Sequence, residues 1–107
     1  MPWSASQFLV DYLIRRKVPF VVGIPGHGNL TFVDAIAARS DELPMLMVRH
    51  EQSAAHLADG YFRVTGQPIV VTTSVGPGAV NTLVGVATAM ADSIPMVVII
   101  ILYAADQ

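Results

Sequence analysis

The sequence contains no cysteine among its 107 residues. This absence excludes disulfide scaffolds, thiolate metal sites and cysteine nucleophiles, and it suits the reducing cytoplasm, where we expect the protein to reside. Charged residues are also scarce, at 13%, where an ordinary soluble domain carries roughly 25%. With six basic and eight acidic residues, the chain lacks the positive surface that nucleic acid or an anionic membrane requires. We therefore expect neither as a partner.

Long hydrophobic runs are absent as well. The longest apolar run, residues 96–105, has ten residues, whereas a membrane-spanning helix needs about 20. No basic segment precedes an apolar one at the start, so no secretory signal is predicted. Apolar residues nevertheless make up 53% of the chain. Because a domain of this size leaves much of its surface exposed, we expect some apolar surface to be covered by another domain or subunit.

Four apolar runs alternate with segments of helical period. Strands are predicted at residues 19–22, 45–48, 69–71 and 96–102, and helices at residues 30–38, 52–64 and 79–90. A first helix is capped by Ser4, and its apolar face takes Phe8, Leu9, Tyr12 and Leu13. Continuous apolar strands alternating with helices are typical of a parallel sheet buried on both faces. We predict one three-layer α/β domain with helices on both faces of the sheet, in flavodoxin-like order.

Three polar turns follow the first three strands: residues 23–29 (the first turn), 49–52 (the second turn) and 72–78 (the third turn). Because the carboxyl ends of parallel strands meet at one edge of a sheet, we expect these turns to lie close together. Ligands of open α/β sheets bind outside that edge. The spacing alone therefore predicts a site built from these turns.

The first turn does not fit the common nucleotide-binding motifs. A dinucleotide fingerprint needs a glycine where Thr31 stands, and a P-loop needs Lys followed by Ser or Thr where Asn29 and Leu30 stand. Three glycines and Pro25 still describe a tight turn that lets the backbone approach a flat ligand. A plain turn before a helix is the alternative interpretation.

The second turn carries Arg49, His50 and Glu51 at the end of an apolar strand. Charge in such a place is costly unless it is paired or used. The alternative interpretations are a carboxylate that stabilises a helix N-terminus for Glu51, a surface ion pair for Arg49 and a satisfied loop histidine for His50. His56, inside the following helix, is interpreted as a packed or interface residue.

The third turn ends in Ser-Val-Gly-Pro-Gly, residues 74–78, and opens a helix. Proline near a helix start gives a rigid bend with exposed N–H groups. No lysine or arginine follows Arg63, so a neutral polar ligand edge fits this bend better than a phosphate does.

These segments together resemble the pyrimidine-binding domain of thiamine-diphosphate-dependent enzymes of the acetolactate synthase, pyruvate oxidase and decarboxylase group. The resemblance rests on FVVGIPGHGN at residues 20–29, VRHEQSAAHLADGYFRVTG at residues 48–66 and TTSVGPGAVNTLVGVATAMADSIPMVVI at residues 72–99. It implies that the chain is a single partial domain, residues 1–107, truncated relative to the full family domain. Residues 100–107 depart from the family pattern.

The resemblance also implies roles for individual residues. Glu51 looks like the glutamate that hydrogen-bonds N1′ of the cofactor's aminopyrimidine, so that the imino tautomer removes the C2 proton of the thiazolium. His27 matches a variable position that often faces substrate. The other cofactor-binding candidates lie in the first turn, in the third turn and in the helix that follows the third turn. They are Gly23, Pro25, Gly26, Gly76, Pro77, Gly78 and Asn81. No metal ligand is expected here, because Asp59 and Gly60 belong to helix packing.

The resemblance further implies an enzyme that acts on 2-oxo acids by decarboxylation and carboligation, assembled as a homodimer or tetramer. In the family a second domain holds Mg²⁺ and the diphosphate through Gly-Asp-Gly followed by Asn, and nothing in this chain matches that motif. Because that motif is missing, we expect the 107 residues alone to be inactive. Some relatives in the family also bind FAD. The alternative function is a non-catalytic association module or a subunit of a split enzyme.

Overall fold

The computed structural model describes residues 3–101 of the chain. Its elements, in chain order, are α1 (Ala5–Arg15), β1 (Val21–Gly23), α2 (Leu30–Ala37), β2 (Met45–Met47), α3 (Glu51–Thr65), β3 (Val70–Thr73), α4 (Pro77–Asn81), α5 (Leu83–Ala91) and β4 (Val97–Ile100). The predicted strand end at residue 102 and the departure over residues 102–107 lie outside the described residues.

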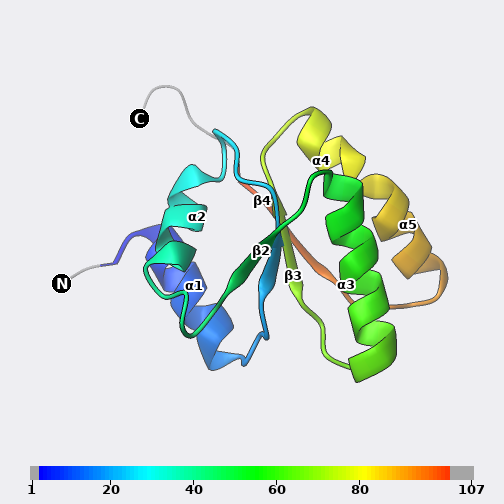
Figure 1. Cartoon of the computed structure of the whole chain (residues 1–107), viewed down its shortest axis with the longest axis horizontal. Coiled ribbons are helices and arrows are strands. Elements are labelled where there is room, and N and C mark those ends of the chain that lie inside the picture. Colours follow the sequence, from blue (N-terminus) through cyan, green and yellow to red (C-terminus); the bar gives the residue numbers. More distant parts are fainter. Residues whose placement is uncertain (1–2, 102–107) are drawn as a thin grey trace.

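The four strands form one parallel sheet in the order β2-β1-β3-β4. Val21 of β1 lies opposite Met45 of β2 and Val70 of β3, and Val70 lies opposite Val97 of β4. Figure 1 shows α1 and α2 on one face of the sheet and α3, α4 and α5 on the other. The predicted three-layer α/β fold and its strand order are confirmed.

Two apolar clusters fill the spaces between the sheet and its helices. Neighbouring strand residues point to opposite faces, so Val21 packs with Phe32 and Ile36 of α2, whereas Val22 packs with Ala54 and Ala58 of α3. Both central strands, β1 and β3, are buried along their whole length. Within residues 3–101, no helix combines the length and the apolar character needed to cross a membrane.

The prediction that all four strands are buried was wrong for β2 and β4. Leu46, Met47, Val97 and Ile100 are each exposed by 45% or more. The reason is topological, because β2 and β4 lie at the two edges of the described sheet and each pairs with only one neighbour. An apolar run alone does not distinguish an edge strand from a central one.

The predicted apolar face of α1 was partly wrong. Ser4 does cap the helix, since its Oγ accepts from the Gln7 backbone N–H and Gln7 Oε1 accepts from the Ser4 N–H. Val10 and Leu13, three positions apart, are the buried residues, whereas Phe8 and Tyr12 are exposed. The i, i+4 pair of aromatic residues forms a separate stripe, which faces away from the sheet.

Thr82 divides the predicted helix 79–90 into α4 and α5. Its hydroxyl donates to the carbonyl oxygen of Ala79 over 2.7 Å, and its backbone N–H bonds the same carbonyl oxygen over 3.2 Å. A hydroxyl that bonds to the preceding turn competes with the regular helical ladder. The break falls directly after Asn81, the last residue of α4, and so separates the site helix from the longer α5.

Candidate functional site

The third turn lies at the centre of the site, because it contacts both other turns. The backbone N–H of Gly28, in the first turn, donates to Ser74 Oγ over 3.0 Å. Glu51, in the second turn, is bonded to Asn81, in the helix that the third turn opens. Figure 1 shows α3 and α4 beginning at the same end of the sheet. The structure therefore brings the three turns together at one edge.

Close backbone packing shapes the first turn. A Cβ atom on Gly26 would lie 2.6 Å from Ser74 Cβ, so only glycine lets the first and third turns approach this closely. Gly23 is the last residue of β1, and a Cβ there would collide with the carbonyl oxygen of Thr72 in β3. Pro25 is half-buried and His27 is exposed. The two glycines thus have a packing role that the sequence did not separate from a ligand role.

His50 positions the start of α3. Its backbone is extended, and its Nδ1 accepts a hydrogen bond from the Gln52 backbone N–H over 3.0 Å. The ring thereby satisfies a helix N–H group that has no partner within the helix. The interpretation of His50 as a satisfied loop histidine is confirmed. Its cap fixes the backbone from which the next side chain, Glu51, leaves.

The interpretation of Arg49 as an ion-pair partner was wrong, and His56 does not fit the packed alternative of its interpretation. Arg49 is exposed and forms no ion pair with any of residues 3–101. His56 is an exposed residue of α3 that lies 3.4 Å from the Gln52 side-chain amide, so it is not packed in the core. Its alternative interpretation as an interface residue stays a prediction.

Glu51 is the first residue of α3 and is half-buried. Its Oε1 accepts a hydrogen bond of 3.1 Å from Asn81 Nδ2. Its Oε2 accepts none from the part of the chain that the structure describes. A Cβ on Gly78 would lie 3.1 Å from this Oε2 and 2.7 Å from Thr73 Oγ1. Glycine at position 78 therefore leaves Oε2 in place, with its lone pairs available to a donor.

Gly76 and Pro77, in the third turn, are exposed. Gly76 has φ 73° and ψ −136°, a backbone conformation that favours glycine, and nothing lies within 4 Å of where its Cβ would be. Pro77 occupies the first position of α4, where its missing N–H costs nothing. The backbone beside the Glu51 carboxylate is thus rigid and open.

This arrangement holds the Glu51 carboxylate through Oε1, while Oε2 accepts no hydrogen bond from residues 3–101, and it leaves exposed backbone beside it. An acceptor oxygen of this kind can take a hydrogen bond from an N–H group at the edge of a flat polar ring. No group of three or more His, Cys, Asp and Glu side chains within residues 3–101 is arranged to hold a metal ion.

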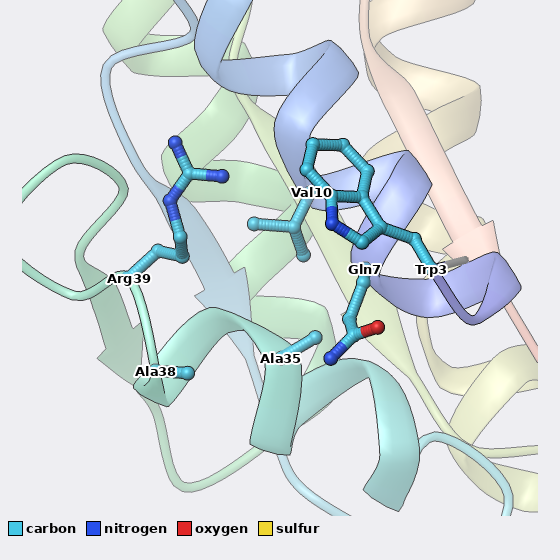
Figure 2. A pocket seen from close by; sticks show the side chains of 6 residues that line it. All are labelled: Trp3, Gln7, Val10, Ala35, Ala38 and Arg39. Atoms are coloured by element: carbon cyan, nitrogen blue, oxygen red, sulfur yellow. The ribbon is translucent and has the colours of Figure 1, made fainter. Parts of the chain in front are cut away.

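A separate pocket of about 180 Å³ lies between α1 and α2. Figure 2 shows its lining side chains, which come from both helices and their flanks, and none belongs to the three turns. The one charged group in it, Arg39, is hydrogen-bonded to both Asp11 and Glu42. Because its charge is already balanced, this pocket offers no anion site.

Sequence reasoning missed the side chains that join the turns: Asn29, Thr72 and Ser74. Asn29 and Thr72 are completely buried and hydrogen-bonded to each other. The run Thr72-Thr73-Ser74 at the end of an apolar strand was the available signal. Three consecutive hydroxyl groups entering a buried sheet edge need partners, and the first turn supplies two of them.

Known proteins match this chain over nearly its whole length. A family model described as "Thiamine pyrophosphate enzyme, N-terminal TPP binding domain" matches residues 4–106. The acetolactate synthase large subunit of Buchnera aphidicola subsp. Acyrthosiphon pisum (strain APS) is 45% identical over 96 residues, covering 90% of this chain and 17% of that protein. The acetolactate synthase isozyme 3 large subunit of Escherichia coli (strain K12) is 44% identical, with the same coverage.

A eukaryotic relative matches as well. The mitochondrial acetolactate synthase catalytic subunit of Saccharomyces cerevisiae (strain ATCC 204508 / S288c) is 42% identical over 95 residues, covering 89% of this chain and 14% of that protein. The chain thus spans less than a fifth of the length of these relatives, 17% in the first two and 14% in the third.

Proposed function

The chain belongs to the family of N-terminal thiamine pyrophosphate-binding domains of thiamine pyrophosphate enzymes, and on this premise we propose that it binds the pyrimidine half of thiamine diphosphate. The whole protein is then an enzyme that acts on 2-oxo acids by decarboxylation and carboligation, as acetolactate synthases do. The names of the relatives support this substrate class. The exposed His27, in the first turn, is the substrate-facing candidate.

One observation supports the proposal: the Glu51 carboxylate is held through Oε1, while Oε2 accepts no hydrogen bond from residues 3–101. With the cofactor bound, Glu51 would share a proton between its carboxylate and N1′ of the aminopyrimidine. Asn81 orients the carboxylate, and Gly78 leaves room for it. Thiamine diphosphate itself supplies the carbanion chemistry, and the protein supplies binding and orientation.

The other candidate residues would surround the cofactor ring rather than react with it. The exposed Gly76 and Pro77 would border the ring on one side, and the half-buried Pro25 and Gly26 would border it from the first turn. The tight packing of Gly23 against β3 supports a role in setting the position of that turn. We propose that Mg²⁺ and the diphosphate are held by a part of the protein outside this chain, and no residue described here supports an FAD site.

Association with a further chain or domain is part of the proposal. Leu83, Val84 and Met90 of α5 are all more than half exposed, which is unusual for large apolar side chains on one helix. The same surface favours a second candidate, a non-catalytic association module or a subunit of a split enzyme. Mass measurement of the native assembly distinguishes a split enzyme from an association module. A split enzyme forms a complex with a separate chain that carries Gly-Asp-Gly, whereas an association module forms an oligomer of its own. We place the protein in the cytoplasm.

The test of the proposed function is an assay of the full-length protein with a panel of 2-oxo acids, with and without thiamine diphosphate and Mg²⁺. We expect turnover that requires the cofactor, with acetolactate among the products, and none from the 107 residues alone. Cofactor-independent turnover, or a full-length protein that fails to bind thiamine diphosphate, would contradict the proposal.

A further inference from the structure

Asn29 has an unusual place at the start of α2. It is the N-cap residue of this helix, yet its side chain caps no helical N–H group. An asparagine at an N-cap ordinarily uses its side-chain oxygen for that purpose. Here the side chain is fully buried and turns back onto the residues that precede it. Its hydrogen bonds serve the first turn instead of the helix.

Three hydrogen bonds fix the Asn29 carboxamide. Its Oδ1 accepts from the Gly26 backbone N–H over 2.7 Å. Its Nδ2 donates to the carbonyl oxygen of Ile24 over 3.2 Å and to Thr72 Oγ1 over 3.3 Å. Since Gly26 supplies only a donor and Ile24 only an acceptor, the orientation of the amide is determined by its partners. The group therefore has a single arrangement in which all its bonds are made.

Thr72 connects this carboxamide to the sheet. Its hydroxyl accepts from Asn29 and donates to the carbonyl oxygen of Ile99, in the edge strand β4, over 3.1 Å. The Gly28 N–H is held separately by Ser74. The backbone of the first turn is thus bonded on both sides of position 27, at Gly26 and at Gly28.

We propose that Asn29 is a positioning residue for substrate binding: its buried carboxamide, anchored on Thr72, holds the first turn so that His27 is presented at the edge that carries Glu51. This inference rests on the proposed function and deepens it. Asn29 itself is buried and touches neither cofactor nor substrate. Its effect therefore falls on the binding of the 2-oxo acid and leaves the carboxylate at Glu51 in place.

The test uses the full-length protein with Asn29→Ala and with the pair Thr72→Val and Thr72→Ser. Asn29→Ala removes all three bonds and is expected to raise KM for the 2-oxo acid by about tenfold while kcat changes by less than about threefold. Thr72→Val removes only the anchor and is expected to raise KM by a smaller factor. Thr72→Ser keeps the hydroxyl and is expected to restore the wild-type KM. If Asn29→Ala fails to fold, the comparison of KM between Thr72→Val and Thr72→Ser still tests the positioning role.

A matched control separates positioning from general loss of stability. Ile69→Val trims a buried residue that directly precedes β3, at the end of the strand away from the three turns, and is expected to leave KM unchanged. Amide hydrogen exchange gives a readout without substrate, in which the Gly26 N–H exchanges about tenfold faster in Asn29→Ala. Equal changes of kcat in all destabilised variants, with KM unmoved, would overturn the inference.

Failure of the proposed function has a different signature. If the wild-type protein neither binds thiamine diphosphate nor turns over a 2-oxo acid, the proposed function fails, and the substrate role of Asn29 fails with it. If wild type binds cofactor and Glu51→Gln abolishes turnover, but Thr72→Val and Asn29→Ala keep the wild-type KM, only the positioning role is contradicted.

Discussion

Asn81 Nδ2 donates a 3.1 Å hydrogen bond to Oε1 of Glu51, and so joins the last residue of α4 to the first residue of α3. The two residues are 30 positions apart in sequence. Because this bond occupies one carboxylate oxygen, it fixes the direction of the other. The orientation of the Glu51 carboxylate therefore depends on the short helix that the third turn opens.

Removal of this donor should weaken catalysis without removing the carboxylate. A hydrogen bond to a charged group contributes about 1.5–3 kcal/mol, so we expect Asn81→Ala to lower kcat/KM of the full-length enzyme by about tenfold or more. Asn81→Asp places a second carboxylate beside Glu51 and should lower it further. Steady-state kinetics at saturating cofactor measures both, and an unchanged kcat/KM in Asn81→Ala would mean that Asn81 does not orient Glu51.

A methyl group at position 78 should displace the carboxylate. The Cβ of Gly78→Ala would meet Thr73 Oγ1 at 2.7 Å and Glu51 Oε2 at 3.1 Å. We expect weaker thiamine diphosphate binding, measured by calorimetric titration in the presence of Mg²⁺. Gly60→Ala is the matched control, since nothing lies within 4 Å of its Cβ position. Equal cofactor affinity in the two variants would contradict this role of Gly78.

The contact between α3 and α5 depends on Gly85. A Cβ there would collide with Cβ of Ala55 and approach the backbone of α3 at 3.0 Å. Overpacking of this kind costs roughly 1–3 kcal/mol, so Gly85→Ala should lower the free energy of unfolding in urea by that amount. Gly60→Ala should instead raise it by roughly 0.5–1 kcal/mol, because alanine is the better helix former. A neutral effect at Gly85 would mean that the two helices separate at little cost.

Acid should loosen the contact between α1 and α2. The hydrogen bond from Arg15 lowers the pKa of Asp11, burial opposes this, and a second hydrogen bond from Arg39 of the neighbouring segment lowers the pKa further. A carboxyl whose pKa is lower in the folded state stabilises the fold above its unfolded pKa, near 4, and this contribution is lost as pH falls through the folded value. Thermal unfolding between about pH 5 and pH 2 should therefore depend less on pH in Asp11→Asn. An unaltered profile in Asp11→Asn would contradict the coupling.

Much of the fold could be predicted from sequence because the central strands and the helices have clear periodicity. The apolar run ending at Gly23 and the one ending in Thr72 and Thr73 are the two buried strands. Edge strands have the same composition, so the exposure of Met47 and Val97 could not be predicted. The break at Thr82 was also hidden, since it depends on one hydroxyl bond.

The position of the candidate site at one sheet edge could be predicted, but the hydrogen bonds that join its turns could not. Parallel topology sends the three turns to one edge, which is why Glu51 and Gly78 could be grouped from their spacing. The hydrogen-bond partners of the Asn29 carboxamide and the Thr72 hydroxyl could not be predicted. Asparagine at a helix start and threonine in a strand ordinarily bond to residues close to them in sequence. Their bonds join residues 43 positions apart, and such pairing is visible only once the chain is folded.

The central claim is that Glu51 exchanges a proton with bound cofactor. Its most direct test is the rate at which the C2 proton of thiamine diphosphate exchanges with deuterated solvent on the full-length protein, wild type against Glu51→Gln, followed by quenched-flow NMR. We expect Glu51→Gln to bind the cofactor and to slow this exchange by about 10²–10⁴-fold, the range typical of a lost acid–base group. An exchange rate in Glu51→Gln equal to that of wild type, with cofactor bound, would contradict the account.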